Sequence, residues 1–212
     1  MGDESFMKQQ IEDKLAAGFS TIKMKIGAID LDTELKLLRS IRDQYSSEEI
    51  TLRVDANGAF SPEDAERVLA ELSRLEVHSI EQPIKTGQWD DMARLCSESP
   101  IPIALDEEMI GVNLSQDKIK LLDNIDPHFI ILKPSLHGGI SGTSEWIKLA
   151  NERQIDWWIT SALESNVGLN AICQFTANYD NPLPQGLGTG SLYTNNIPSA
   201  LVVENAHIYR KK

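Results

Sequence analysis

Polar side chains recur at nearly equal steps along this chain, each at or near the end of a short apolar run. The series Lys25, Asp55, Glu81, Asp106 and Lys133 advances by 30, 26, 25 and 27 residues. A strand, a helix and their loops take roughly 25–30 residues, so this spacing predicts one polar group for each βα unit. In a parallel barrel the carboxyl ends of the strands converge on one face, where active sites form. The spacing therefore predicts a pocket lined by carboxylates and lysines.

Composition and charge favour a globular protein that acts on a small molecule. The chain has 212 residues, enough to bury a substantial core, and its formal net charge of −12 argues against nucleic acid or an anionic membrane as a partner. The sequence shows no apolar run of about 18 residues and no export leader, and we expect a cytoplasmic location. Cys96 and Cys173 lie in separate helical patterns and are expected to be reduced, buried thiols. The oligomeric state stays open.

Apolar patterns predict strands and helices that alternate along the whole chain. Ser61 before Pro62 is typical of a helix start, with a capping hydroxyl and a proline in the first turn. The predicted strands cover 21–26, 50–55, 78–82, 101–105, 129–133, 156–161 and 184–188, and the predicted helices cover 3–18, 31–45, 61–75, 89–97, 114–124, 142–153 and 167–178. Such alternation indicates a parallel α/β fold.

The number of predicted strands falls one short of a complete barrel. An eight-stranded barrel usually needs about 250 residues, and this sequence opens directly into a helix. Seven parallel strands leave two unpaired edges. The segment 191–212 contains an apolar run, 200–203, that no barrel position requires. We therefore expect residues 1–190 to form an incomplete barrel and residues 191–212 to pack on a part outside this sequence.

Three acids, Asp55, Glu81 and Asp106, end consecutive predicted strands. A set of carboxylate oxygens without histidine suits Mg²⁺ rather than zinc, and Mn²⁺ can substitute for it. Held close together without a cation, these groups would repel one another and take up protons. The alternative is three unrelated surface acids that cap helices, but their common register favours a metal site.

Lysines occupy the two outer predicted strands of this series. Lys23 and Lys25 alternate with Thr21, so a strand would direct all three to one face, and we expect burial and mutual repulsion to depress the pKa of both lysines. The alternative is an edge strand whose lysines face water. Lys133 ends the apolar run 129–132 and is expected to point into the same pocket. This layout suits removal of a proton next to a carboxylate, with a metal and a lysine stabilising the enediolate.

Five short motifs stand at these positions: Lys23-Met24-Lys25, Asp55-Ala56-Asn57, Glu81-Gln82-Pro83, Asp106-Glu107 and Lys133-Pro134. Together they resemble the enolase superfamily, in its muconate-lactonizing-enzyme-like subgroup. The segments 132–139, 160–166 and 186–190 resemble the o-succinylbenzoate synthase family within it. The resemblance implies a TIM-type (β/α)₇β barrel with a capping domain built mainly from residues before the barrel. We therefore expect such a stretch and the first barrel strand to lie outside this sequence.

The resemblance also implies catalytic roles. It makes Asp55, Glu81 and Asp106 the Mg²⁺ ligands. Lys25 would take the proton next to the substrate carboxylate and then help hydroxide to leave. Lys133 would stabilise the enediolate through its charge.

The remaining motif residues would support these groups. Lys23 would hold the pKa of Lys25 down. Contacts with the substrate or with a metal ligand are expected from Asn57, Ser161, Glu164, Ser165, Gly188 and Gly190.

Several functions remain open at this point. The resemblance implies an Mg²⁺-dependent hydro-lyase of menaquinone biosynthesis that acts on a small carboxylate. An N-acylamino-acid racemase or dipeptide epimerase of the same superfamily would use the same two lysines. An inactive barrel fragment with only a structural role is the third reading. His137, beside two glycines, is interpreted as a turn residue rather than a ligand.

Overall fold

The computed structural model describes residues 4–188 and 193–211, in which strands and helices alternate as predicted. The chain forms two compact units, the first comprising Met1–Glu108 and Asn124–His128 and the second Met109–Asp123 and Phe129–Lys212. The first unit carries α1 (Glu4–Ala16), β1 (Thr21–Lys25), α2 (Leu31–Arg42), β2 (Thr51–Asp55), α3 (Pro62–Ser73), β3 (Ser79–Glu81), α4 (Trp89–Glu98) and β4 (Ile103–Leu105). The short 3₁₀ helix η1 (Glu107–Met109) follows β4.

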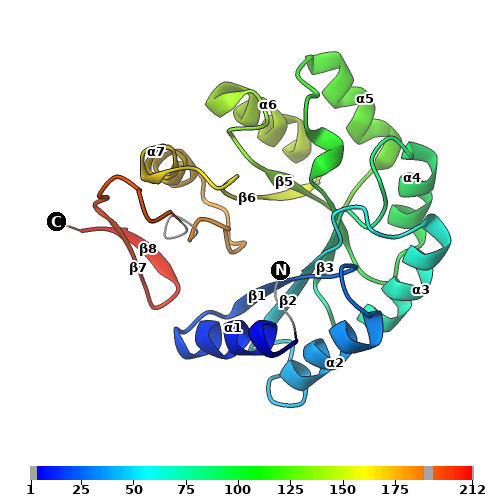
Figure 1. Cartoon of the computed structure of the whole chain (residues 1–212). Helices are drawn as coiled ribbons and strands as arrows, with labels where there is room; N and C mark the ends of the chain where they lie inside the picture. The colour runs from blue at the N-terminus through cyan, green and yellow to red at the C-terminus, as the bar shows by residue number, and fades with distance from the viewer. Residues whose placement is uncertain (1–3, 189–192, 212) are drawn as a thin grey trace. The chain divides into compact units, whose positions relative to one another are not determined.

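The four strands of the first unit pair in parallel in the order of the sequence. Helices α1 to α4 lie along one face of these strands (Figure 1). The register sets Lys25 opposite Asp55, and Asp55 opposite Glu81. Backbone bonds continue past the strand ends, since Ile26 N donates to Asp55 O over 2.9 Å and Ala56 N donates to Glu81 O over 3.0 Å. The carboxyl ends of β1, β2 and β3 are therefore level.

Side-chain alternation places the core of the first unit between its strands and its helices. Ile22 and Met24 on β1 are buried, while Lys23 and Lys25 between and after them are more exposed. This confirms the predicted division of β1 into an apolar face and a lysine face. On β2 every residue from Leu52 to Asp55 is buried, so both faces of that strand are covered.

Local capping explains where two of these helices begin. Ser61 Oγ accepts a hydrogen bond from Asp64 N at 3.1 Å, and Pro62 takes the first helical position of α3, as predicted. Asp30 caps α2 in the same way, since its side chain accepts from Thr33 N at 3.1 Å.

The second unit carries β5 and β6, which pair in parallel with Phe129 opposite Asp156 and Leu132 opposite Ile159. Its elements are α5 (Ser115–Ile125), whose last two residues group with the first unit, β5 (Phe129–Leu132), α6 (Gly139–Asn151), β6 (Asp156–Ile159), α7 (Asn166–Thr176), β7 (Leu201–Glu204) and β8 (His207–Arg210). The two cysteines, one in each unit, are buried free thiols, as predicted.

The strand predicted at 184–188 is reduced to a single bridge. Gly186 pairs with Thr160, and its N–H donates to Ile159 O over 2.9 Å. Pro184 has no N–H to donate, so a ladder cannot extend through it. Gln185 makes up for part of this loss, because its side-chain oxygen accepts from Ile159 N at 2.7 Å.

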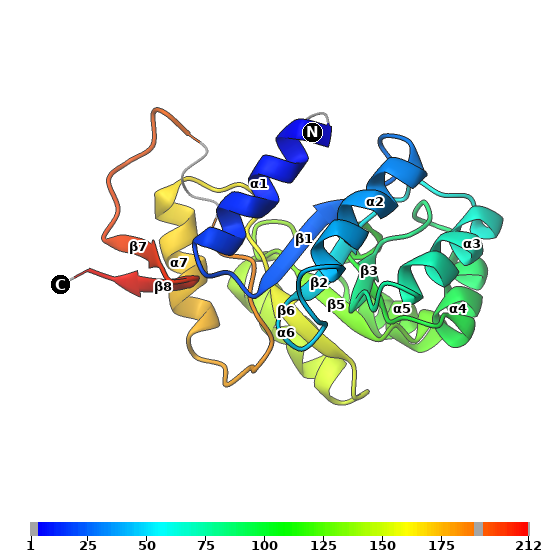
Figure 2. The ribbon, with the colours of Figure 1, turned by 90° about the horizontal axis from the view of Figure 1, so that it is seen from below.

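The apolar run at 200–203 forms part of an antiparallel hairpin, which the sequence pattern does not predict. β7 and β8 pair with Leu201 opposite Arg210 and Glu204 opposite His207. Both views place this hairpin next to α7 of the same unit (Figures 1 and 2). The assignment of residues 1–190 and 191–212 to a barrel and a tail stays a prediction.

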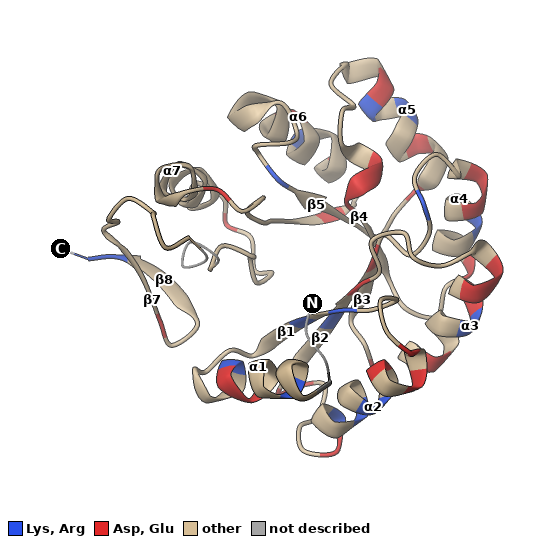
Figure 3. Cartoon of the chain, viewed as in Figure 1, with Lys and Arg blue, Asp and Glu red and all other residues tan. Residues whose placement is uncertain are grey.

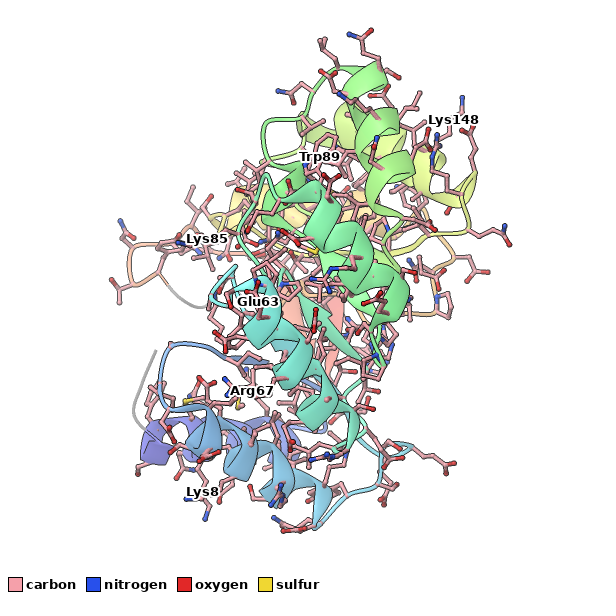
Figure 4. The ribbon with its side chains drawn as sticks, turned by 90° about the vertical axis from the view of Figure 1, so that its right-hand side faces the viewer. Lys8, Glu63, Arg67, Lys85, Trp89 and Lys148 are labelled. Atoms are coloured by element: carbon pink, nitrogen blue, oxygen red, sulfur yellow. The ribbon has the colours of Figure 1, made fainter. Side chains whose placement is uncertain are left out.

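Charged side chains cover the outer helices of the first unit. Acidic residues are frequent along α3 and α4 (Figure 3). Glu63 and Arg67 lie exposed on α3, and Lys8 lies exposed on α1 (Figure 4). Within the described part of the chain, none of the helices has the length and apolar character needed to span a bilayer.

Candidate active site

The candidate site begins at the level carboxyl ends of β1, β2 and β3. Asp55 and Glu81 are each only 2% exposed, and Asp106, directly after β4, is fully buried. Buried carboxylates are costly unless a cation or hydrogen-bond donors compensate them. Their burial at one edge of a sheet argues against the alternative of three surface acids.

The Lys23 ammonium lies between two of these carboxylates. Its Nζ stands 2.9 Å from Asp55 Oδ2 and 2.5 Å from Glu81 Oε2. Burial opposes the charged form of this lysine, but the adjacent Glu81 and Asp55 outweigh burial and raise its pKa above the ordinary value. The expectation of a depressed pKa for Lys23 is therefore wrong, because the facing carboxylates dominate over any repulsion from Lys25.

Lys25 is the more open of the two lysines, with 49% of its side chain exposed. Its Nζ lies 3.6 Å from Asp55 Oδ2 and donates a hydrogen bond to Asn57 Oδ1 at 2.5 Å. Asn57 adopts a positive φ of 45° and also donates from Nδ2 to Glu107 Oε1 over 2.7 Å. Asn57 thus holds Lys25 near Asp55 without burying it.

Glu81 is the most perturbed carboxyl group of the site. Burial raises its pKa to about 8, and the neighbouring carboxylates of Asp55 and Asp106 add to that effect against the opposing charge of Lys23. The Asp106 side chain lies within hydrogen-bonding reach of Glu81, which also raises the pKa of Glu81. For Glu81, this direction agrees with the expectation that crowded carboxylates take up protons.

The three carboxylates are suitable ligands for a hard divalent cation. In this structure the Lys23 ammonium lies between two of them. Among residues 4–188 and 193–211, no group of three His, Cys, Asp or Glu side chains is arranged as a ready metal cage. Lys23 supplies the positive charge between Asp55 and Glu81 instead. The buried Glu81 Oε1 accepts no hydrogen bond from a nitrogen or hydroxyl donor. Buried carboxylate oxygens such as those of Asp55, Glu81 and Asp106 are the ligands that Mg²⁺ prefers.

Gln82 and Glu108 also shape this site, although their sequence positions predict no role for either. Gln82 is fully buried with a positive φ of 41°, and its Oε1 accepts from Asp106 N at 3.3 Å and from Glu108 N at 3.1 Å. Its Nε2 donates to Ile84 O over 3.0 Å. Glu108 accepts from Trp89 Nε1 at 2.7 Å. The Gln82 amide therefore ties the loop that carries Asp106 to the end of β3.

Another acid organises the loop that follows Lys25. Glu34 on α2 is 1% exposed and accepts the backbone N–H groups of Gly27, Ala28 and Ile29 at 2.8, 3.3 and 3.4 Å. Gly27 has a φ of 81°, and a Cβ there would stand 2.5 Å from Ala59 Cβ. Only glycine fits this position. The hydrogen bonds to Glu34 hold the loop after β1 in place.

Lys133 directly follows β5 in the second unit and is partly exposed. A tight turn holds its backbone, since Leu136 N donates to Lys133 O over 2.8 Å and His137 N donates to the same oxygen over 3.1 Å. His137 is 1% exposed, and its ring Nδ1 accepts from Lys133 N at 3.0 Å. His137 does belong to a turn, as predicted, but its ring also has a structural partner there.

Glu164 organises the loop after β6. It accepts from Ser135 Oγ at 2.6 Å and from Ala162 N at 2.9 and 3.0 Å. Burial opposes ionisation of Glu164, but these hydrogen bonds outweigh it and hold its pKa below the usual range. Ser161 Oγ accepts from Leu163 N at 3.2 Å. Both Glu164 and Ser161 therefore order this loop.

The other expected contacts are more weakly defined by the structure. Ser165 precedes α7 and makes no side-chain cap there. Gly188 is exposed, with no atom near the position of a Cβ. Gly190 lies outside the described residues. The first unit brings together Lys23, Lys25, Asp55, Asn57, Glu81 and Asp106, and the second unit holds Lys133, Ser161, Glu164, Ser165 and Gly188. The catalytic, metal and substrate roles of all these residues stay predictions.

Comparisons with known proteins agree with this fold. The o-succinylbenzoate synthase of Desulfotalea psychrophila is 57% identical over 204 residues, which cover 96% of this chain and 55% of that protein. The crystal structure of MenC from Desulfotalea psychrophila LSv54 matches with a TM-score of 0.91 at 54% identity, over 98% of this chain and 57% of that one. An L-Ala-D/L-Glu epimerase of Francisella tularensis subsp. novicida is 31% identical over 79% of this chain and 46% of its own length.

These relatives are longer than the present chain, which spans about half the length of each. The match at a TM-score of 0.91 confirms the expected barrel-type α/β fold. The family described as enolase C-terminal domain-like matches residues 7–211, which is nearly the whole chain. The chain belongs to this enolase C-terminal domain-like family.

Proposed function

We propose that the protein containing this chain is an Mg²⁺-dependent carbon–oxygen lyase of the o-succinylbenzoate synthase type, which serves menaquinone biosynthesis. The observation that carries this proposal is the 57% identity to the o-succinylbenzoate synthase of Desulfotalea psychrophila over 96% of the chain. The carboxylate and lysine cluster at the ends of β1 to β3 supports it. The substrate class is a small carboxylate that loses water.

Lys25 is the proposed base, and its surroundings suit that role. It is half exposed, so substrate can reach it, and it stands 3.6 Å from Asp55 rather than between two carboxylates. Neutral Lys25 removes the proton next to the substrate carboxylate and, as its ammonium, returns a proton to the departing hydroxide. Lys23, held by Asp55 and Glu81, keeps its proton and acts as a fixed positive charge.

Asp55, Glu81 and Asp106 would hold Mg²⁺, and Mn²⁺ can substitute. A bound divalent cation supplies positive charge to the oxygens of the substrate carboxylate as the neighbouring carbon loses its proton. Lys133 is proposed to remain an ammonium and to stabilise the enediolate through its charge. The contacts of Asn57 and Glu164 support roles in ordering Lys25 and the loop after β6.

An epimerase of the same superfamily is the second candidate, favoured by the 31% identity to an L-Ala-D/L-Glu epimerase. The two functions require different roles of Lys133. In a dehydratase it would stabilise the enediolate through its charge alone, whereas in an epimerase it would also exchange a proton. The third candidate is an inactive chain with only a structural role.

One experiment separates the three candidates. The native protein that carries this sequence is given Mg²⁺ and the hydrate of o-succinylbenzoate, and the new aromatic ring is followed by ultraviolet absorbance. Separate samples receive dipeptides or N-acylamino acids, and the loss of optical rotation is followed. Dehydration as the faster reaction supports the proposal. Epimerisation alone would replace it with the second candidate, and no turnover of either substrate class would leave the structural role.

A further inference from the structure

In the second unit, His137 binds both the backbone N–H and the backbone C=O of Lys133. Its ring Nδ1 accepts the Lys133 N–H at 3.0 Å, and its own backbone N–H donates to Lys133 O over 3.1 Å. The side chain is 1% exposed, so water does not compete for these bonds. The backbone on either side of the Lys133 Cα atom is therefore tied to one residue.

Close packing at the start of α6 keeps this histidine in place. A Cβ on Gly142 would stand 2.1 Å from His137 O, so only glycine lets α6 approach this closely. The indole of Trp146, itself fully buried, meets the imidazole at an angle of 62° with the ring centroids 6.4 Å apart. The ring has little freedom to rotate away from Lys133.

A buried lysine also contacts that indole. Lys118 is 1% exposed, and its Nζ lies 5.3 Å from the centroid of the Trp146 ring. The same Nζ donates to Gly142 O over 3.2 Å and to Glu145 Oε2 over 2.6 Å. Lys118, Trp146 and His137 thus form a continuous buried row from α5 through α6 to the turn after β5.

The hydrogen bond from Lys133 N fixes the protonation of the imidazole. A ring nitrogen that accepts a hydrogen bond carries no proton, so Nδ1 is bare and the neutral ring carries its proton on Nε2. An imidazolium, or the other tautomer, could not accept the Lys133 N–H.

We propose that His137 is a positioning residue that sets the direction in which the Lys133 side chain leaves the backbone. This inference rests on the proposed function, because it matters for catalysis only if Lys133 stabilises the enediolate. A shift of about 1 Å in a catalytic group can cost about 100-fold in rate. The imidazole prevents such a shift by fixing the backbone of Lys133 rather than by touching the substrate.

The first test reads the tautomer directly and does not depend on turnover. The chain is labelled with ¹⁵N in histidine, and the imidazole nitrogens are observed by NMR near neutral pH. A His137→Asn variant identifies the His137 signals. The expected result is an unprotonated Nδ1 and a protonated Nε2. A protonated Nδ1 would overturn the inference.

The second test uses two substitutions at His137 in the native protein with Mg²⁺. His137→Leu removes the acceptor, and we expect kcat to fall about 100-fold while KM stays within about twofold. The side-chain oxygen of His137→Asn can take the place of Nδ1, so this variant is expected to recover at least a tenth of the wild-type kcat. His207→Leu, the same change at an exposed histidine of β8, is the matched control and should retain full activity.

The outcomes separate the two proposals. A folded His137→Leu protein with wild-type kcat would overturn the positioning role of His137. So would equal losses in His137→Leu and His137→Asn, because the acceptor would then be irrelevant. If His137→Leu fails to fold, the NMR result and the kcat of His137→Asn decide the question. A wild-type protein that turns over no carboxylate substrate would overturn the proposed function, irrespective of the tautomer.

Discussion

Lys118 should make the fold sensitive to the loss of its partner carboxylate. The Lys118 Nζ is buried and stands 2.6 Å from Glu145 Oε2, while Glu145 itself is 36% exposed. Breaking a fully buried ion pair by removing one partner costs about 3–5 kcal/mol. Gly142 O and the Trp146 ring still stabilise the cation, and Glu145 is partly solvated, so we expect Glu145→Ala to lower the free energy of unfolding by about 2–3 kcal/mol.

Removal of the lysine instead of the carboxylate should lower the free energy of unfolding by less. Lys118→Met keeps most of the buried volume and removes the charge, and well-packed apolar replacements of buried ions cost little. We expect a loss of about 1 kcal/mol or less. The double variant should then resemble Lys118→Met alone, because Glu145 matters mainly as the counter-charge. Urea unfolding at pH 7 of the wild type and the three variants completes a double-mutant cycle.

The same cycle has a predicted pH dependence. Hydrogen bonds from Lys118 and Ser115 hold the pKa of Glu145 below its usual value in the folded state. A depressed folded pKa gives stability that is present above the ordinary glutamate pKa, about 4.3, and is lost as the pH falls through the folded value. The coupling between Lys118 and Glu145 should therefore shrink in acid. A Glu145→Ala protein as stable as the wild type, or a costlier Lys118→Met, would refute this reasoning.

Three further predictions address the site and the packing. Glu81→Gln should weaken Mg²⁺ binding by the chain at least about tenfold in calorimetry, because a buried ligand charge is lost; an unchanged affinity removes Glu81 from the ligand set. Lys25→Arg should abolish dehydration since guanidinium does not exchange protons in the useful range, whereas Lys133→Arg should keep measurable turnover. Robust dehydration by Lys25→Arg would exclude Lys25 as the base. Gly142→Ala should lower the free energy of unfolding by about 1–3 kcal/mol, because its Cβ would meet His137 O at 2.1 Å; an unchanged urea midpoint would contradict this.

The strands β1 to β6 and the helices α1 to α7 were predictable because their patterns are local. Period-two alternation on β1 separates Ile22 and Met24 from Lys23, and fully apolar runs predict strands such as β5 that are covered on both faces. The start of α3 follows from Ser61 and Pro62, which act within one turn of the helix. Such signals do not depend on where the rest of the chain lies.

The hairpin β7–β8 was missed because its turn lacks the usual sequence signal. Asn205 and Ala206 both adopt positive φ values, 50° and 60°, as a two-residue turn between antiparallel strands requires. Asn followed by Gly is the common pair for such a turn, and alanine in the second place hides it. Without that signal, the sequence favours a surface at 200–203 that packs on another part of the protein.

The predicted direction of the Lys23 pKa shift was wrong for a different reason. The sequence shows that Lys23 and Lys25 are neighbours on one strand face, which suggests repulsion. It does not show that Lys23 reaches Asp55 and Glu81, because that contact depends on side-chain direction across two strand pairs. Attraction between charges about 3 Å apart then outweighs both burial and repulsion.

The residues that hold the site in place were the least visible in the sequence. Gln82 acts on the backbone of Asp106, and His137 acts on the backbone of Lys133, so in each case the side chain serves a neighbour's N–H group rather than presenting a reactive group. Both side chains are almost fully buried, and both are polar. A buried polar side chain must find a partner, and here each partner is the main chain of a candidate catalytic or metal-binding residue. A polar residue next to such a motif is therefore a candidate positioning group, which a search for acids, bases and metal ligands alone passes over.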